Sequence, residues 1–317
     1  MSSTPGEPLP VIEADGLQKS YGEVEAVRGL GFEVRAGEVV GLLGPNGAGK
    51  TTVINMLTTL ISIDSGRASV GGFDVATQAY QVRRMIGLAG QSAAVDEKLT
   101  ARENLTLFAR LYKLPRAGIA GRVEELIERF RMDEFADRAV GTLSGGQRRR
   151  LDVVAALVAD PPALFLDEPT TGLDPRSRSA LWEAIEGLRD DGTAIVLTTQ
   201  YLEEADRLAD HIVLIDEGVA VAAGTPAQLK SNLERDVLEI HFGSDEALDM
   251  AVTMVGEAAT NRAGRLVQVP VGNGAGSSLD VLRRLDDAGI AITDFQLRKP
   301  TLDDVFMTLT GGKEGAR

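Results

Sequence analysis

Short apolar runs alternate with helical segments along the second half of the chain. Three apolar runs, at Ala163–Leu166, Ala194–Leu197 and Ile212–Ile215, are separated by helical periods at Leu181–Leu188 and Leu202–Leu208. Strands that are continuously apolar and alternate with helices are typical of a parallel sheet that helices cover on both faces. The pattern therefore predicts an α/β core.

Two further regions precede this core. Residues 9–43 contain short β segments that end in the apolar run Val39–Leu43, whereas residues from about 92 to 160 follow a helical period. Thr100 and Glu103 form a capping box, a pattern that begins a helix, near the start of the helical region. We therefore expect a β-rich segment and a helical segment beside the core.

The character of the chain changes beyond about residue 232. Strand-like and helix-like segments alternate there, with a Gly/Ser-rich stretch at 272–278 that predicts a loop. This pattern predicts a separate, small α/β domain over residues 232–317, after a larger domain over residues 9–231. The expected strands are Val237–Phe242, Leu266–Val271 and Ile290–Leu297, and the expected helices are 245–258, 278–287 and 301–310.

Composition excludes several classes of protein. The 317 residues carry 33 basic and 47 acidic side chains, a net charge of −14, which disfavours binding to nucleic acid or adhesion to anionic lipid. The absence of cysteine excludes disulfides and Cys-ligated metals, and two histidines are too few for a His-rich site. The longest mostly apolar stretch, Val153–Ala159, is too short to span a membrane, and no secretory signal is visible. We expect a soluble, cytosolic chain.

A glycine-rich segment between Leu43 and a helical stretch fits the pattern G-x-x-x-x-G-K-[ST]. Its backbone amides, its lysine and the helix N-terminus would bind phosphates, and a threonine hydroxyl could ligate Mg²⁺. The alternative is a glycine-rich turn without a ligand, which the correct flanking strand and helix make less attractive. The candidate residues are Gly44, Pro45, Asn46, Gly47, Ala48, Gly49, Lys50, Thr51 and Thr52.

Two carboxylates end the apolar strand that begins at Leu164. Asp167 is placed to act in the Mg²⁺ shell, and Glu168 could serve as the base that activates a water in line with the γ-phosphate. An exposed acidic pair at a strand end is the plain alternative, and it would be preferred if the pair stood alone.

A second potential phosphate-binding helix terminus follows Leu143. A serine there can cap the helix, and two glycines would let the backbone approach an anion. By itself this sequence is more often just the start of a helix. The residues are Ser144, Gly145, Gly146 and Gln147.

Taken in order and spacing, these segments resemble the motifs of ATP-binding cassette (ABC) proteins over residues 9–230, together with Gln91 and Gly172-Leu-Asp174. The resemblance implies an α/β P-loop NTPase fold with a core sheet, an antiparallel β subdomain and an inserted helical subdomain at about 92–160. It also implies a head-to-tail homodimer around two ATP molecules with Mg²⁺. In such a dimer Ser144–Gln147 completes the partner's site, Tyr21 stacks on adenine, and Gln91 reaches both the Mg²⁺ and a membrane partner.

One position departs from the family pattern. Most members carry a histidine where this chain has Gln200, and a glutamine can donate a hydrogen bond to phosphate but cannot accept a proton. The site is therefore either impaired or uses Glu168 as its base, and we favour the second reading. Thr198-Thr-Gln-Tyr-Leu and the tail Lys299–Gly311 further resemble the daunorubicin-resistance ATP-binding subfamily, whose members energise a separately encoded permease that exports antibiotics or lipids.

The resemblance thus predicts the ATPase subunit of an exporter, peripheral on the cytoplasmic face of the membrane and bound to it only through the permease. The alternatives are a soluble ABC ATPase that acts on ribosomes or DNA, and an importer subunit. For the C-terminal domain, a packing or dimer-supporting role is preferred to a regulatory one, because it shows no cluster of chemical groups. His241 is expected to be a partly exposed sheet residue.

Overall fold

The computed structural model describes residues 9–90, 94–233, 235–255, 259–272 and 275–310. The chain divides into two compact units, Met1–Pro226 and Ala227–Arg317, and each is described by itself.

A six-stranded sheet with the order β10-β9-β3-β8-β7-β6 forms the centre of the first unit. Neighbouring strands run parallel except for β10, which pairs antiparallel with β9. The parallel sheet predicted from the continuous apolar runs is confirmed, and its central strands are buried along their whole length. The strands are β3 (Val39–Leu43), β6 (Ile86–Ala89), β7 (Ala163–Asp167), β8 (Ala194–Thr199), β9 (His211–Asp216) and β10 (Val219–Gly224).

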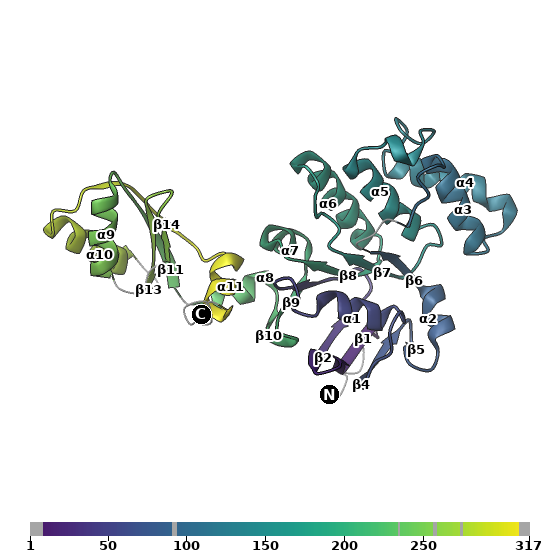
Figure 1. Cartoon of the computed structure of the whole chain (residues 1–317), viewed down its shortest axis with the longest axis horizontal. Coiled ribbons are helices and arrows are strands. Elements are labelled where there is room, and N and C mark those ends of the chain that lie inside the picture. Colours follow the sequence, from purple (N-terminus) through teal and green to yellow (C-terminus); the bar gives the residue numbers. More distant parts are fainter. Residues whose placement is uncertain (1–8, 91–93, 234, 256–258, 273–274, 311–317) are drawn as a thin grey trace. The chain divides into compact units, whose positions relative to one another are not determined.

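Each face of this sheet has its own hydrophobic core, because successive strand residues point to opposite faces. Leu164 and Leu166 face the helices α5 (Gly145–Ala156) and α6 (Pro175–Asp190), whereas Phe165 faces α1 (Lys50–Leu57). In Figure 1, α5 and α6 lie on one side of the strands, and α1 and the purple N-terminal strands lie on the other.

The N-terminal strands form a four-stranded antiparallel sheet with the order β2-β1-β4-β5. The hydrophobic pattern gave no prediction for residues 58–90, where the structure has two short strands of this sheet, a short helix and the edge strand β6. These short elements carry too few residues to show a period. The bounds are β1 (Ile12–Tyr21), β2 (Val24–Val34), β4 (Ser65–Val70), β5 (Phe73–Asp74) and α2 (Ala79–Met85).

The expected helical region is present as α3 (Ala101–Leu111) and α4 (Arg116–Arg129), followed by the 3₁₀ turn Val140–Thr142 and α5. The capping box is confirmed, since Thr100 accepts from the Glu103 amide and Glu103 accepts from the Thr100 amide. Among the helices in the described part of the chain, none combines the length and apolar character needed to cross a bilayer.

The second unit is an antiparallel sheet with the order β12-β13-β11-β14, preceded by α8 (Pro226–Ser231). Apolar residues of α9 and α10 pack against one face of it. The predicted loop at 272–278 is wrong for its second half, because α10 already begins at Ala275; glycine and serine are tolerated in a first helical turn, and Ser278 is buried. The remaining bounds are β11 (Arg235–Phe242), α9 (Asp245–Val255), β12 (Ala259–Asn261), β13 (Leu266–Gly272), α10 (Ala275–Asp287), β14 (Ile292–Arg298) and α11 (Leu302–Thr310).

Candidate functional site

The turn between β3 and α1 is packed so closely that two of its positions require glycine. A Cβ at Gly44 would lie 2.2 Å from the Ile215 carbonyl oxygen, and one at Gly49 would lie 2.3 Å from the Ala26 carbonyl oxygen. Gly49 also has φ of 102°, in the left-handed region that favours glycine. The glycines at these two positions are thus explained by close backbone contacts.

Helix α1 begins at Lys50 with a terminus suited to an anion. Its N-cap is Gly49, so no side chain caps the first amides, and its first turn holds no acidic residue. The amides of a first helical turn and the helix dipole together favour a bound negative group such as a phosphate.

The Lys50 ammonium is buried at this terminus. Its Nζ donates to the carbonyl oxygens of Gly44 at 2.7 Å and Pro45 at 2.9 Å, and lies 3.8 Å from Glu168 Oε1. Burial lowers the pKa of Lys50, and the negative charges of Glu168 and Asp167 oppose that shift. The lysine is therefore a fixed positive charge between the loop and the end of β7.

Asp167 joins three segments that are distant in sequence. Its carboxylate is buried, and Oδ1 accepts hydrogen bonds from Thr51 Oγ1 at 3.1 Å and from Thr198 Oγ1 at 2.6 Å. Hydroxyl and carboxylate oxygens are the ligands that Mg²⁺ prefers. The two oxygens of Thr51 and Asp167 consequently fit a magnesium site beside the phosphate-binding turn.

Glu168 has an unusual backbone conformation, with φ of 49°. Its amide donates to Thr198 Oγ1 at 2.9 Å and to the Thr198 carbonyl oxygen at 3.2 Å, and its Oε2 accepts from Thr171 Oγ1 at 3.2 Å. A left-handed non-glycine residue costs on the order of 1–3 kcal/mol and is concentrated at functional sites. Here the strained backbone turns the carboxylate toward Lys50.

These groups line one cavity of about 410 Å³. It gathers Glu168 and six of the nine predicted turn residues on a single surface, whereas Gly44, Pro45 and Ala48 do not line it. Ala26, on β2, was missed by sequence reasoning, because nothing in its residue type marks it. The lining residues are Ala26, Asn46, Gly47, Gly49, Lys50, Thr51, Thr52 and Glu168.

The segment Ser144–Gln147 forms the capped start of α5, as predicted. Ser144 Oγ accepts from the Gln147 amide at 3.2 Å, and Gln147 Oε1 accepts from the Ser144 amide at 3.0 Å. A Cβ at Gly146 would lie 2.3 Å from Ser177 Oγ on α6. Gln147 lines a separate recess beside α6, so within one chain this segment does not form part of the wall of the 410 Å³ cavity.

Two other predicted residues, Tyr21 and Gln200, do not line this cavity, and a third, Gln91, is not among the residues that the structure describes. Tyr21 ends β1 with its side chain half exposed and its ring 5.9 Å from Lys19 Nζ. Gln200 is half-buried directly after β8. Gln91 lies outside the described residues.

Sequence reasoning missed two residues that support the carboxylates. Thr198 contacts both Asp167 and Glu168, and its only sequence signal is its place at the end of an apolar strand. Arg149 on α5 donates from Nη2 to the Asp167 carbonyl oxygen at 2.9 Å. Nothing in the sequence connects it with a strand 18 residues later.

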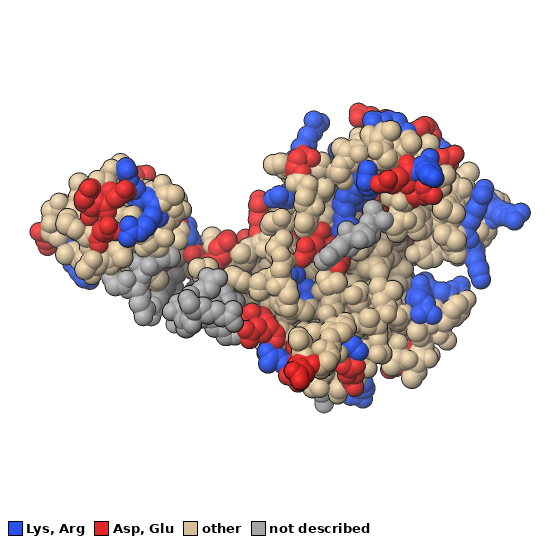
Figure 2. Space-filling view, viewed as in Figure 1, with Lys and Arg blue, Asp and Glu red and all other residues tan. Residues whose placement is uncertain are grey.

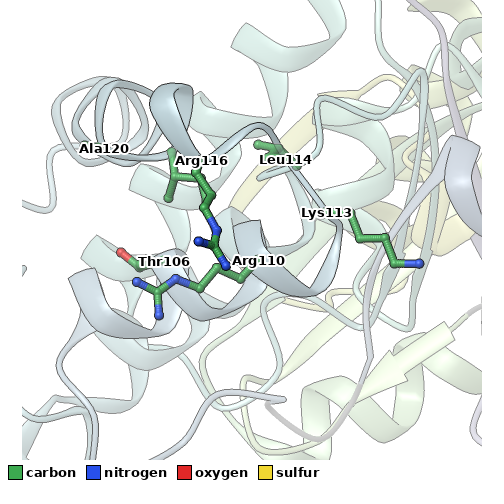
Figure 3. Close-up of a pocket in the computed structure, with 7 residues that line it drawn as sticks. Thr106, Arg110, Lys113, Leu114, Arg116 and Ala120 are labelled. Atoms are coloured by element: carbon green, nitrogen blue, oxygen red, sulfur yellow. The ribbon is translucent and has the colours of Figure 1, made fainter.

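A second cavity lies at the turn between α3 and α4 (Figure 3). Arg110 and Arg116 extend toward it, and the Lys113 side chain points away. Charges of both signs are interspersed over unit 1 in Figure 2, where Lys and Arg side chains protrude at the end formed by α3 and α4. The cavity is cationic, and no carboxylate or histidine that could act as a base lines it. It is lined by Thr106, Arg110, Lys113, Leu114, Arg116, Ile119 and Ala120.

Comparison with known proteins gives two family matches. The model described as "ABC transporter" matches residues 27–171, and the model described as "ATP-binding protein DrrA1-3-like, C-terminal domain" matches residues 224–310. The chain is 47% identical over 305 residues to daunorubicin resistance ATP-binding protein DrrA2 of Streptomyces coeruleorubidus, covering 95% of each.

Two further comparisons agree with these. The daunorubicin/doxorubicin resistance ATP-binding protein DrrA of Streptomyces peucetius is 42% identical over 314 residues, covering 96% of this chain and 94% of that protein. The structure of an ATP-binding subunit of an ABC transporter superposes with a TM-score of 0.64 at 30% identity, covering 70% of this chain and 92% of the other.

Proposed function

Because this chain belongs to the family of ABC transporter ATP-binding proteins, in its daunorubicin- and doxorubicin-resistance branch, we propose that it hydrolyses ATP to drive a separate permease that exports a hydrophobic compound. The expected ABC ATPase fold is confirmed. The drug-resistance names of the relatives favour an exporter over an importer or a ribosome- or DNA-associated ATPase.

The convergence of Lys50, Thr51 and Glu168 on the 410 Å³ cavity carries this proposal. The triphosphate would lie along the turn Gly44–Thr52, where the amides of α1 and the Lys50 ammonium face it. Charge stabilisation by fixed donors of this kind accounts for most of the catalysis of phosphoryl transfer.

Thr51 and Asp167 would hold Mg²⁺, and by family resemblance Gln91 would add a third ligand. A bound magnesium ion would neutralise charge on the β- and γ-phosphates. Thr198 keeps the Asp167 carboxylate in place from the neighbouring strand, at 2.6 Å.

Glu168 would act as the general base, accepting a proton from the water that attacks the γ-phosphate. Its strained backbone and the hydrogen bond from Thr171 orient the carboxylate. Gln200 would donate a hydrogen bond to the γ-phosphate, a role that its amide can fill without accepting a proton.

The proposed site is completed by a second copy of the chain. Ser144–Gln147 forms a capped helix terminus outside the cavity wall of its own chain, so a head-to-tail partner could present it to the γ-phosphate. ATP would then favour the closed dimer because it binds both chains in that state. Tyr21, half exposed at the end of β1, would stack on adenine.

In this proposal residues 9–231 are the nucleotide-binding domain, with the helical subdomain at about 92–160, and residues 232–317 are an accessory domain that supports packing or dimerisation. The permease would hold the chain on the cytoplasmic face of the membrane and dock near residues 91–105. Pull-down of the tagged chain in mild detergent should recover an integral membrane protein. A soluble dimer recovered alone or with ribosomes would contradict the transport role.

Glu168→Gln tests the chemical part of the proposal. Loss of a general base should slow ATP hydrolysis about 10²-fold or more while ATP binding persists. The variant should also elute as a dimer with Mg-ATP in size-exclusion chromatography. Lys50→Ala is the matched control, since it should lose ATP binding and therefore remain a monomer. Unchanged turnover in Glu168→Gln would exclude Glu168 as the base, and a monomer at high concentration would count against the dimer.

A further inference from the structure

Arg149 lies on α5, two residues after Gln147, and its side chain is 11% exposed. Its guanidinium donates in three directions. Nε donates to the Pro169 carbonyl oxygen at 2.9 Å and Nη2 to the Asp167 carbonyl oxygen at 2.9 Å, while Nη1 donates to the Gly90 carbonyl oxygen. One side chain thus connects α5 with the end of β7 and the end of β6.

The two carbonyl groups near the end of β7 that Arg149 contacts belong to Asp167 and Pro169, the residues on either side of Glu168. Glu168 has a left-handed backbone, a conformation that persists only when surrounding contacts hold it. Thr198 accepts a hydrogen bond from the Glu168 amide, and Arg149 donates to the carbonyl oxygens of the preceding and following residues. The direction of the Glu168 carboxylate consequently depends on both contacts.

Asp152, one turn further along α5, balances the charge of Arg149. Arg149 Nη1 lies 3.2 Å from Asp152 Oδ2, and Asp152 Oδ1 accepts from the Ala94 amide at 2.9 Å. Burial lowers the pKa of Arg149 and raises that of Asp152, so each charged form relies on the other. The pair holds Gly90 and Ala94, the residues on either side of 91–93.

We propose that Arg149 is a positioning residue that transmits the placement of α5 to the backbone of Glu168. Movement of α5 when two chains close on ATP would then set the direction of the Glu168 carboxylate. A guanidinium suits this task because its three nitrogens each reach a different acceptor at a fixed angle, whereas a lysine carries all its donors on one nitrogen. The inference rests on the proposed role of Glu168.

Arg149→Lys in the full chain tests the inference. The lysine keeps a positive charge beside Asp152 but loses the contacts on both sides of Glu168. We expect kcat for ATP hydrolysis to fall about 10-fold or more, because small misplacements of a catalytic group are costly, while KM for ATP stays within about 2-fold. The control is Arg150→Lys on the same helix, whose guanidinium donates to the Arg131 carbonyl oxygen and not to β7. It should keep the parental kcat.

A double variant separates positioning from a general loss of structure. If Arg149 acts through Glu168, Arg149→Lys should cause no further loss in single-turnover hydrolysis when Glu168 is already glutamine. An equal loss in both backgrounds would overturn the inference, as would a parental kcat in Arg149→Lys. ATP affinity and Trp182 fluorescence report whether each variant is folded. If Glu168→Gln alone hydrolyses ATP normally, the proposed base fails independently of Arg149.

Discussion

The two units of the chain bury charged residues to different extents: Lys50, Asp152, Asp167 and Glu204 are buried in the described part of the first unit, and Asp236 in that of the second. In the first unit Lys50, Asp152 and Asp167 each contact a residue more than 40 positions away in the chain: Glu168, Ala94 and Thr51 respectively. In the second unit the partly exposed Arg298 on β14 pairs with Glu239 on β11 and with Asp304 on α11, and the buried Asp236 pairs with the exposed Lys299. Burying a charge requires partners at fixed positions, so we expect substitution of these buried residues or of their partners to be costly.

Backbone packing differs in the same way. Gly44 contacts the main chain of β9, whereas Gly243, between β11 and α9, would place a Cβ 3.5 Å from Thr293 Oγ1, an ordinary contact. The first unit therefore depends on particular residues at particular places, and the second depends on its hydrophobic pattern.

The largest effect that would test this contrast is expected from Gly44→Ala. The added Cβ must displace the Ile215 carbonyl, so unfolding free energy should fall by about 1–3 kcal/mol or more and ATP binding should be lost. Urea unfolding followed by circular dichroism measures the first change and nucleotide titration the second. Gly243→Ala is the matched control and should change neither. Equal effects of the two substitutions would remove the contrast in backbone packing.

An intermediate effect confined to the second unit is expected from Arg298→Ala. Its side chain contacts Glu239 at 2.6 Å and Asp304 at 2.6 Å, so its loss should cost that unit about 1–3 kcal/mol, the usual contribution of hydrogen bonds to charged groups. ATP binding should not change. All tyrosines and the single tryptophan lie before residue 227, so their signals report on the first unit, and hydrogen exchange can report on the second. Loss of ATP binding would show that the units are coupled.

The same network predicts a pH dependence. Hydrogen bonding from Arg298 lowers the pKa of Glu239; burial would raise the pKa of Asp304, but hydrogen bonds from Arg298 and Thr301 outweigh it and lower that pKa too. A carboxyl group with a lowered folded-state pKa stabilises the fold above its unfolded pKa, and this contribution disappears as pH falls through the folded value. The difference in unfolding free energy between the parent and Arg298→Ala should therefore be largest at pH 7 and should shrink below about pH 4. A constant difference from pH 7 to pH 3 would contradict this assignment.

The smallest effect is expected from Gln200, within the first unit. Gln200→Ala should lower the rate of ATP hydrolysis by removing a donor to the γ-phosphate, whereas Gln200→His should keep or raise the rate. Steady-state hydrolysis of the three proteins decides this. Equal rates in all of them would show that Gln200 makes no catalytic contact.

The elements that could be predicted from the sequence are those with a clear hydrophobic period or a specific motif. The apolar runs of β7, β8 and β9 predicted a parallel sheet, and Ser144 predicted the cap of α5, because these signals are local. The short elements between residues 65 and 89 were missed because they contain too few residues to show a period. The Gly/Ser stretch at 272–278 predicted a loop, yet the packing of α10 recruits its second half into a helix.

The family, the glycine-rich turn before α1 and the two carboxylates that follow β7's apolar run could be predicted from the chain alone, since each depends on residues close together in it. Only the tertiary structure revealed the contacts that hold Glu168. Thr198 and Arg149 come from a neighbouring strand and from a helix of another region, and their residue types carry no signal of that role. The physical reason is that a buried carbonyl or carboxylate must find a donor in space, and folding alone decides which residue supplies it.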